Sequence, residues 1–193
     1  MNWYFAWIGG FWIVTRAKRE TSLRRLAVRR KPAQPARGVL QAGPLALPVA
    51  LGRAGIKANK REGDGATPRG AFRLTRLWWR ADRHPRPATL LPVRRIGADD
   101  GWCEDPCDRH YNRPVKLPPR AKADRLARQD HLYDFIIEID HNTRPRVAGR
   151  GSAVFIHVAR PGFAPTAGCV ALPMNSLRRL LARIGPRTKI MVE

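Results

Sequence analysis

His157 and Cys169 are the two residues of this chain whose types and spacing are best suited to chemistry. Residues 154–158 alternate between branched aliphatic side chains and the pair Phe155 and His157, which is the period of a β-strand. This pattern places His157 near a strand end, on the face opposite the aliphatic residues. An imidazole that faces a thiol can take its proton, as a cysteine nucleophile with a general base requires.

The segment between the two residues is predicted to be a loop that ends at Gly168, directly before the cysteine. A glycine at this position lets the backbone turn tightly. We expect the N–H groups of Gly168 and Cys169 to stabilise an oxyanion, because backbone donors aimed at developing charge lower a reaction barrier. Thr166 is expected to hydrogen-bond the loop or a substrate.

The same two residues also have a purely structural interpretation. Free cysteine is among the most buried residue types and often serves as a small core residue. Short His/Cys patterns, moreover, do not transfer well between protein families. The two residues by themselves therefore leave catalysis and core packing open.

The stretch from 152 to 173 resembles the signature of L,D-transpeptidase catalytic domains, the YkuD-type fold. His157 matches the upstream histidine of that family, while Thr166, Gly168 and Cys169 match its Ser/Thr-His-Gly-Cys motif. Ala167 stands where many members carry a second histidine, and the loop is short for the family. These departures indicate a divergent subgroup.

A second segment, residues 60–72, also resembles this family. Thr67-Pro-x-Gly-x-Phe72 is similar to a motif found early in these domains, where a loop leads into a strand that lines the cleft. The resemblance covers residues 38–192. It implies a mainly β fold, a YkuD-like β-sandwich or meander with a few short helices, one of them after the cysteine loop.

The resemblance also implies a function, that of a peptidoglycan L,D-transpeptidase. The Cys169 thiolate would form a thioester with the diaminopimelate carbonyl of a donor stem peptide, and His157 would protonate the leaving amine. An amine of a second stem would then complete a 3,3 or a 1,3 cross-link, and Ala167 favours the 1,3 subgroup. We expect Arg160 to bind a stem carboxylate, which guanidinium matches in geometry, and Tyr133 to contact the substrate.

No acid stands at an obvious spacing to orient His157, and the resemblance implies a backbone carbonyl in that role. It implies no cofactor and a location in the periplasm or cell envelope. Cys103 and Cys107 have C-x3-C spacing and could bridge in an oxidising compartment. A zinc site would need more ligands than His110 adds nearby, so we expect no metal.

Hydrophobic periodicity predicts the elements that position these residues. We expect an amphipathic helix after Pro173, which Asn175 or Ser176 can cap, and at most a short exposed helix within 120–130. We divide the chain into an apolar and then basic extension, 1–37, and a catalytic domain, 38–193. The expected strands are Leu23–Arg29, Gly38–Gly43, Leu45–Leu51, Phe72–Trp79, Tyr133–Ile139 and Thr188–Val192.

The charge of the chain is strongly positive, with 37 Lys and Arg against 15 Asp and Glu, a net charge of +22. Such a charge attracts polyanions, among them nucleic acid, anionic lipid and the carboxylate-bearing wall polymer. A basic nucleic-acid-binding protein is thus an alternative, although no motif for reading nucleic acid is recognisable. A cysteine carboxypeptidase that hydrolyses the same thioester and a catalytically idle wall-binding module are further alternatives.

Residues 3–14 form an apolar, tryptophan-rich run that is too short to span a bilayer as an ordinary helix. It lacks the basic start and small-residue cleavage site of a secretory signal. An atypical signal, an anchor on the membrane surface and a misassigned start codon all fit the pattern.

Overall fold

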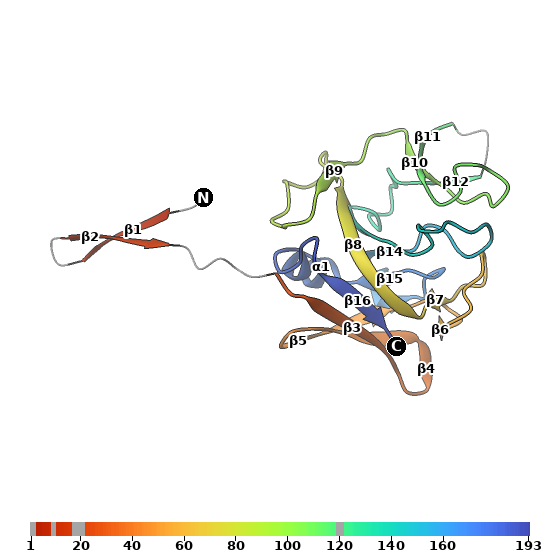
Figure 1. The fold of residues 1–193 in the computed structure, drawn as a ribbon, viewed down its shortest axis with the longest axis horizontal. Helices are drawn as coiled ribbons and strands as arrows, with labels where there is room; N and C mark the ends of the chain where they lie inside the picture. Colours follow the sequence, from red (N-terminus) through yellow and green to blue (C-terminus); the bar gives the residue numbers. More distant parts are fainter. Residues whose placement is uncertain (1–2, 9–10, 17–21, 119–121) are drawn as a thin grey trace.

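The computed structural model describes residues 3–8, 11–16, 22–118 and 122–193, and within them the fold is mainly β (Figure 1). This confirms the predicted fold class. The strands predicted from periodicity form within a few residues of their expected bounds. Alternation predicted them well because most have one face toward the interior and one toward solvent.

The main sheet closes on itself. β8 pairs with β16 on one side and with β13 on the other, so eight strands form a ring and β9 adds outside it. In spatial order the strands are β13 (Phe135–Ile139), β14 (Phe155–Val158), β15 (Val170–Leu172), β5 (Leu45–Ala50), β4 (Gln34–Ala42), β3 (Arg25–Lys31), β16 (Lys189–Val192), β8 (Gly70–Trp79) and β9 (Val93–Arg95).

The inside of the ring is the main hydrophobic core. Alternate residues of β3, such as Leu26 and Val28, are fully buried there, as is Leu40 of β4. Helix α1 (Met174–Leu181) adds Leu177 and Leu180 to the same core. Each fully buried side chain of this size contributes about 1.5–3 kcal/mol relative to an exposed one. The core thus fixes the strand that carries His157 and the helix that follows Cys169.

Helix α1 confirms the predicted helix after the cysteine loop but not its predicted cap. The helix begins at Met174, directly after Pro173, and no side chain caps its first turn. Asn175 and Ser176 lie inside the helix, so the prediction that one of them caps it is wrong. An N-cap residue needs a non-helical backbone, which Pro173 has at φ −54 and ψ 145, whereas Asn175 and Ser176 already lie within the helix.

A small sheet covers the outside of the ring beside β8. β10 (Asp100–Cys103) pairs with β11 (Pro114–Lys116) and with β12 (Ala123–Arg125). The short exposed helix that residues 120–130 would at most form is absent over its described part, and residues 119–121 lie outside the described chain. With little apolar face to bury, this segment gains more by pairing with β10 than by forming an isolated helix.

A second apolar cluster joins this sheet to the ring. The Trp102 ring meets Phe155 edge to face with centroids 4.9 Å apart and Trp78 with centroids 6.4 Å apart. Cys169 belongs to the same cluster. The candidate nucleophile Cys169 therefore lies where the ring of eight strands meets the small sheet of β10, β11 and β12.

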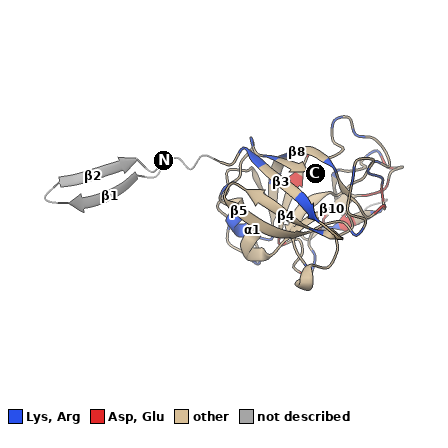
Figure 2. Cartoon of the chain, turned by 90° about the horizontal axis from the view of Figure 1, so that it is seen from below, with Lys and Arg blue, Asp and Glu red and all other residues tan. Residues whose placement is uncertain are grey.

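The remaining elements are short. β1 (Trp3–Ile8) and β2 (Phe11–Arg16) form a hairpin, β6 (Ile56–Lys57) pairs with β7 (Thr67–Pro68), and η1 (Pro161–Phe163) is a 3-10 turn. Within the described residues, no helix has both the length and the apolar character needed to cross a membrane. Lys and Arg positions are spread over several elements of the body rather than gathered on one strand or helix (Figure 2).

Candidate active site

Two parallel strands bring the predicted base and nucleophile together. β14 and β15 are paired in parallel with Ile156 opposite Val170, so Cys169, one residue before β15, lies level with Phe155. The side chains of Phe155 and His157 share one face of β14, because residues two apart on a strand point the same way. Cys169 and His157 both line a cavity of about 370 Å³ on that face.

All of the predicted site residues line this cavity. His157 and Cys169 are 6% and 7% exposed, and Gly168 is also buried. The exposed Arg160 and Ala167 lie at the mouth, and Thr166 is half-buried. The set brought together is Tyr133, His157, Arg160, Thr166, Ala167, Gly168 and Cys169.

His157 is held by a backbone carbonyl rather than by a carboxylate. Its Nδ1 lies 2.8 Å from the carbonyl oxygen of Val158. A carbonyl can only accept, so Nδ1 carries the proton and Nε2 is left as an acceptor. Burial lowers the pKa of His157 to about 4, which keeps the imidazole neutral at neutral pH. The ring is thus ready to accept a proton.

The Cys169 thiol is protonated and held by the backbone. Sγ donates to the Ala153 carbonyl at 3.2 Å and accepts from the Phe155 N–H at 3.3 Å. Burial raises the pKa of the thiol to about 12, and the nearby Asp124 and Glu104 act in the same direction. The resting pair is therefore a neutral thiol beside a neutral imidazole.

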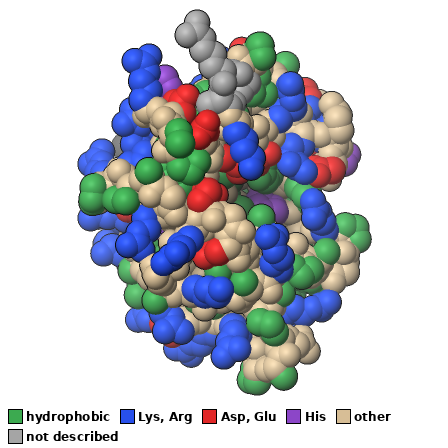
Figure 3. Space-filling view, turned by 90° about the vertical axis from the view of Figure 1, so that its right-hand side faces the viewer, with side chains coloured by type: hydrophobic (Ala, Val, Ile, Leu, Met, Phe, Trp, Pro, Cys, Tyr) green, Lys and Arg blue, Asp and Glu red, His purple; other side chains and the backbone are tan. Residues whose placement is uncertain are grey.

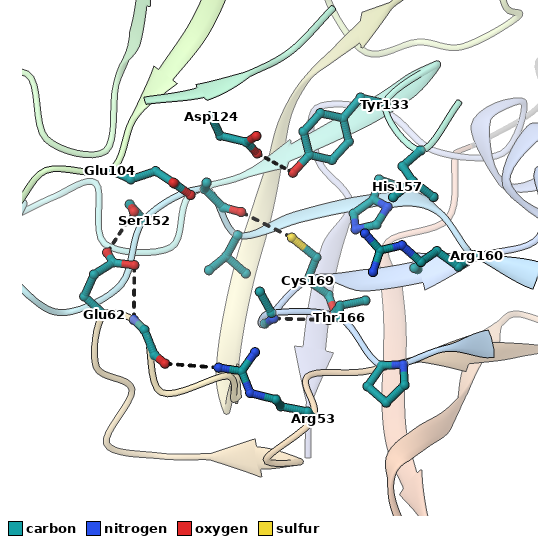
Figure 4. Close-up of a pocket in the computed structure, with 18 of the residues that line it drawn as sticks. Arg53, Glu62, Glu104, Asp124, Tyr133, Ser152, His157, Arg160, Thr166 and Cys169 are labelled. Carbon is teal, nitrogen blue, oxygen red and sulfur yellow. Dashed lines mark hydrogen bonds between the residues drawn. The ribbon is translucent and has the colours of Figure 1, made fainter. Parts of the chain in front are cut away.

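No hydrogen bond joins these two described residues, although both side chains face the cavity and lie next to each other in Figure 4. The thiol must leave the Ala153 carbonyl before it can meet Nε2 of His157. A catalytic hydrogen bond of this kind is often long in the free enzyme and forms only with substrate bound.

Thr166 organises the loop before the cysteine. Its hydroxyl donates to the Cys169 carbonyl at 2.7 Å and accepts from the Gly168 N–H at 3.1 Å. The Gly168 amide would have to give up that bond to reach an oxyanion. Of the two predicted oxyanion donors, Cys169 N–H is thus the one without this competing partner.

The Thr-Pro loop packs directly against the cysteine loop. Gly168 has φ +150, and a Cβ there would lie 2.8 Å from the Ala66 carbonyl oxygen. Only glycine fits such a close approach of two backbones. Thr166 is anchored too, since its N–H donates to the Leu51 carbonyl at 2.9 Å. The two segments with family motifs therefore form one unit.

Tyr133 forms part of the wall behind the imidazole. It is 8% exposed, and its ring meets that of His157 edge to face with centroids 5.3 Å apart. Its hydroxyl donates to Asp124 Oδ2 at 2.7 Å. Arg160 stands on the same side of the sulfur as His157 in Figure 4 and has its guanidinium near the imidazole.

Sequence reasoning missed the charged residues that form the rest of the wall. Glu62 accepts hydrogen bonds from the hydroxyls of Tyr111 and Ser152, and Lys60 pairs with Asp64 at 2.6 Å. The loop from 60 to 72 was singled out, but nothing in its spacing showed that it turns toward the cysteine. The lining residues without a sequence signal are Arg53, Glu104, Lys122, Asp124 and Arg128.

Cys103 and Cys107 lie outside this wall and do not pair. Cys103 is buried, Cys107 is exposed, and both are free thiols. Among the described residues, no group of three or more His, Cys, Asp or Glu side chains is placed to hold a metal ion.

A cysteine and a histidine that line one cavity, with a glycine-led turn before the cysteine, form the arrangement expected of a cysteine-dependent acyl transferase. Comparison with family models agrees, because residues 36–192 match the YkuD model, an L,D-transpeptidase catalytic domain. The chain belongs to this family of cysteine transpeptidases, whose enzymes act on peptidoglycan stem peptides in the cell envelope. No curated protein and no solved structure gives a significant match.

Proposed function

We propose that this enzyme cross-links peptidoglycan in the periplasm with Cys169 as nucleophile and His157 as general base. One observation carries this proposal. The Nδ1–H of His157 is committed to the Val158 carbonyl, so its free Nε2 faces a cavity that it shares with the Cys169 thiol. A neutral acceptor beside a neutral thiol suits proton transfer at the moment of attack.

In the first half-reaction the donor stem binds, and the Cys169 thiol gives up its hydrogen bond to the Ala153 carbonyl. Sγ attacks the diaminopimelate carbonyl carbon as its proton passes to Nε2 of His157. The Cys169 N–H stabilises the oxyanion, a kind of contact worth about 2.7–4 kcal/mol. His157 then protonates the departing D-alanine nitrogen, and the C–N bond breaks to leave a thioester on Cys169.

In the second half-reaction an amine of another stem attacks the thioester. His157, neutral again, takes the proton of the incoming amine, and the thiol leaves as the new amide forms. Arg160 binds the carboxylate next to the departing D-alanine nitrogen. Ala167, exposed where relatives carry a histidine, leaves room at the mouth and favours an L-alanine acceptor, which gives a 1,3 link.

The test uses purified tetrapeptide stems and mass spectrometry of the products. A cross-linked dimer supports transfer, and the mass fragments distinguish 3,3 from 1,3 links. A shortened stem without dimer would replace transfer by hydrolysis. If neither product forms and an immobilised wall preparation is retained equally by wild type and Cys169→Ala, the chain is a binding module instead.

A carbapenem, an inhibitor class of this family, tests the nucleophile directly. Intact-mass measurement should show one adduct on wild type and none on Cys169→Ala. Cys107→Ala is the matched control, because Cys107 is the exposed thiol and the one most open to adventitious labelling. An adduct that survives Cys169→Ala contradicts the assignment.

A further inference from the structure

Glu104 is an acidic side chain without a partner in a strongly basic protein. It follows β10 and lines the active-site cavity, and its carboxyl makes no hydrogen bond or ion pair with any described residue. Every other acidic side chain in the described chain accepts at least one hydrogen bond. With a net charge of +22, an unpaired half-buried carboxyl is the exception here.

The other two acids of the cavity are already occupied. Asp124 holds the Tyr133 hydroxyl and lies 3.3 Å from Arg128, while Glu62 holds the hydroxyls of Tyr111 and Ser152. Their charges nevertheless act on Glu104. Burial, as the largest cause, together with the charges of Asp124 and Glu62 raises the pKa of Glu104 to about 7. A cation bound at Glu104 would stabilise the charged form of the carboxyl, which burial and the neighbouring carboxylates disfavour.

Glu104 and Arg160 lie on opposite sides of the sulfur, and the lining cations Lys122 and Arg128 act on Glu104 without pairing with it. In Figure 4 the Cys169 sulfur lies between Glu104 and Asp124 on one side and His157 and Arg160 on the other. In the space-filling view, acidic and basic side chains both border a hollow that holds a histidine (Figure 3). A ligand here meets the unpaired Glu104 carboxyl beyond the sulfur and the Arg160 guanidinium beside the imidazole.

The positions of His157 and Glu104 indicate on which side of the sulfur each part of the substrate lies. His157 must protonate the leaving amine and deprotonate the incoming one, so both amines lie on its side of the sulfur. The side of Glu104 is then left for the acyl part, which stays bonded to Cys169 in the thioester. In a diaminopimelate donor the side chain of the acyl residue ends in an ammonium with three N–H donors, on the same carbon as a carboxylate.

We infer that Glu104 recognises the free side-chain ammonium of the diamino acid in the donor stem. This inference rests on the proposed function, since it places the acyl donor at Cys169. Glu104 makes the enzyme selective for donors whose side-chain amine is free and charged. It acts in specificity and takes no part in the bond changes.

The test compares two donors and two enzymes. The donors are the tetrapeptide stem and the same stem acetylated on the side-chain nitrogen of its diamino acid, which removes the charge but keeps the scissile bond. Glu104→Gln should lower kcat/KM for D-alanine release from the free-amine donor by about tenfold to a hundredfold, the range for a hydrogen bond to a charged group. For the acetylated donor the two enzymes should agree within about twofold.

Asp99→Asn is the control, because Asp99 is exposed, pairs with Lys116 and does not line the cavity. This variant should have the kcat/KM of wild type for both donors. Equal losses on both donors with Glu104→Gln would show a structural role and overturn the inference. Equal rates with wild type on both donors would overturn it as well.

Binding separates this inference from the proposed function. Titration calorimetry of both peptides into Cys169→Ala and into Cys169→Ala/Glu104→Gln needs no catalysis. The inference expects the second variant to lose affinity for the free-amine peptide only. If wild type releases no D-alanine while this difference persists, the proposed function fails and the ammonium site stands. If the affinities match, the ammonium site fails whatever the activity.

Discussion

Three histidines of this protein, His84, His131 and His157, lie in two contrasting environments. His84 and His131 both lie on Asp134, at 2.8 Å and 2.9 Å from its Oδ2, and Arg83 meets Oδ1 at 2.8 Å. Burial opposes the charge of Asp134, yet hydrogen bonds from His84, His131 and Arg83 hold its pKa below the usual value. His157, in contrast, has a neutral backbone carbonyl as its partner.

The contrast shows that a carboxylate partner alone does not make a histidine a suitable base. A carboxylate that holds an imidazole looks like part of a catalytic triad, but the Asp134 group contains no thiol or other nucleophile. The imidazole beside the thiol has no carboxylate, and its burial favours the neutral form that can accept a proton. We therefore expect the Asp134 group to stabilise the fold and His157 to serve the reaction.

The largest expected effect comes from His157→Gln. Loss of the base should reduce Cys169 acylation by about 10²–10⁴-fold, the range for general acid–base catalysis. Intact-mass kinetics with the tetrapeptide measures the rate. His84→Gln is the matched control, because it removes a histidine from the Asp134 group and should keep the rate within a fewfold. Equal losses in the two variants would erase the distinction between the two environments.

Asp134→Asn should act on stability instead. Asp134 is 1% exposed, and removing its charge leaves Arg83 without its ionic partner. Breaking a buried pair typically costs about 3–5 kcal/mol, and the partly exposed partners here place the expectation near the lower end. Urea unfolding measures the loss. If the Asp134→Asn variant folds but is acylated far more slowly than wild type, the residues around Asp134 also serve catalysis.

Acid should destabilise the protein through His157. Its pKa falls from an unfolded value of about 6.5 to about 4 in the folded state, so below pH 6.5 the unfolded chain binds a proton that the folded one does not. The contribution is fully present above pH 6.5 and is lost as the pH falls toward 4, about 2–3 kcal/mol between pH 7.5 and 4.5. In His157→Gln this part of the pH dependence of unfolding should disappear. An unchanged pH profile would mean that folding does not lower the pKa of His157.

Thr166→Val should give the smallest effect and tests whether uncharged contacts organise the site. Valine keeps the shape but leaves the Gly168 N–H and the Cys169 carbonyl without the hydroxyl. We expect about 1–2 kcal/mol on the acylation barrier, or roughly fivefold to thirtyfold in rate. Thr166→Ser restores the hydroxyl and should recover most of the rate. A serine variant as slow as the valine variant would assign the effect to packing.

The fold was predictable where periodicity reports burial. The strands of the ring and helix α1 have one apolar face, and they formed close to their expected bounds. Within 120–130, helix propensity alone did not decide the structure, because the stretch has little apolar face and β10 offers it a strand to pair with.

The candidate site was predictable where local sequence carries the chemistry, as at His157, Gly168 and Cys169. Closure of the ring was beyond such reasoning, because it depends on β8 pairing with a strand more than fifty residues away. Glu104 and Asp124 come to the cavity through the outer sheet, a long-range arrangement with no short-range signal. That the Glu104 carboxyl has no partner among the described residues can be recognised only from the three-dimensional structure.

The close contact between Gly168 and the Ala66 carbonyl has a consequence for engineering. A mutagenesis library confined to the loop before Cys169 would sample few functional sequences, because the neighbouring loop limits the backbone at that point. Libraries that vary residues 64–67 together with 166–168 let both backbones adjust at once. Changing acceptor preference in this enzyme therefore calls for paired randomisation of two segments a hundred residues apart.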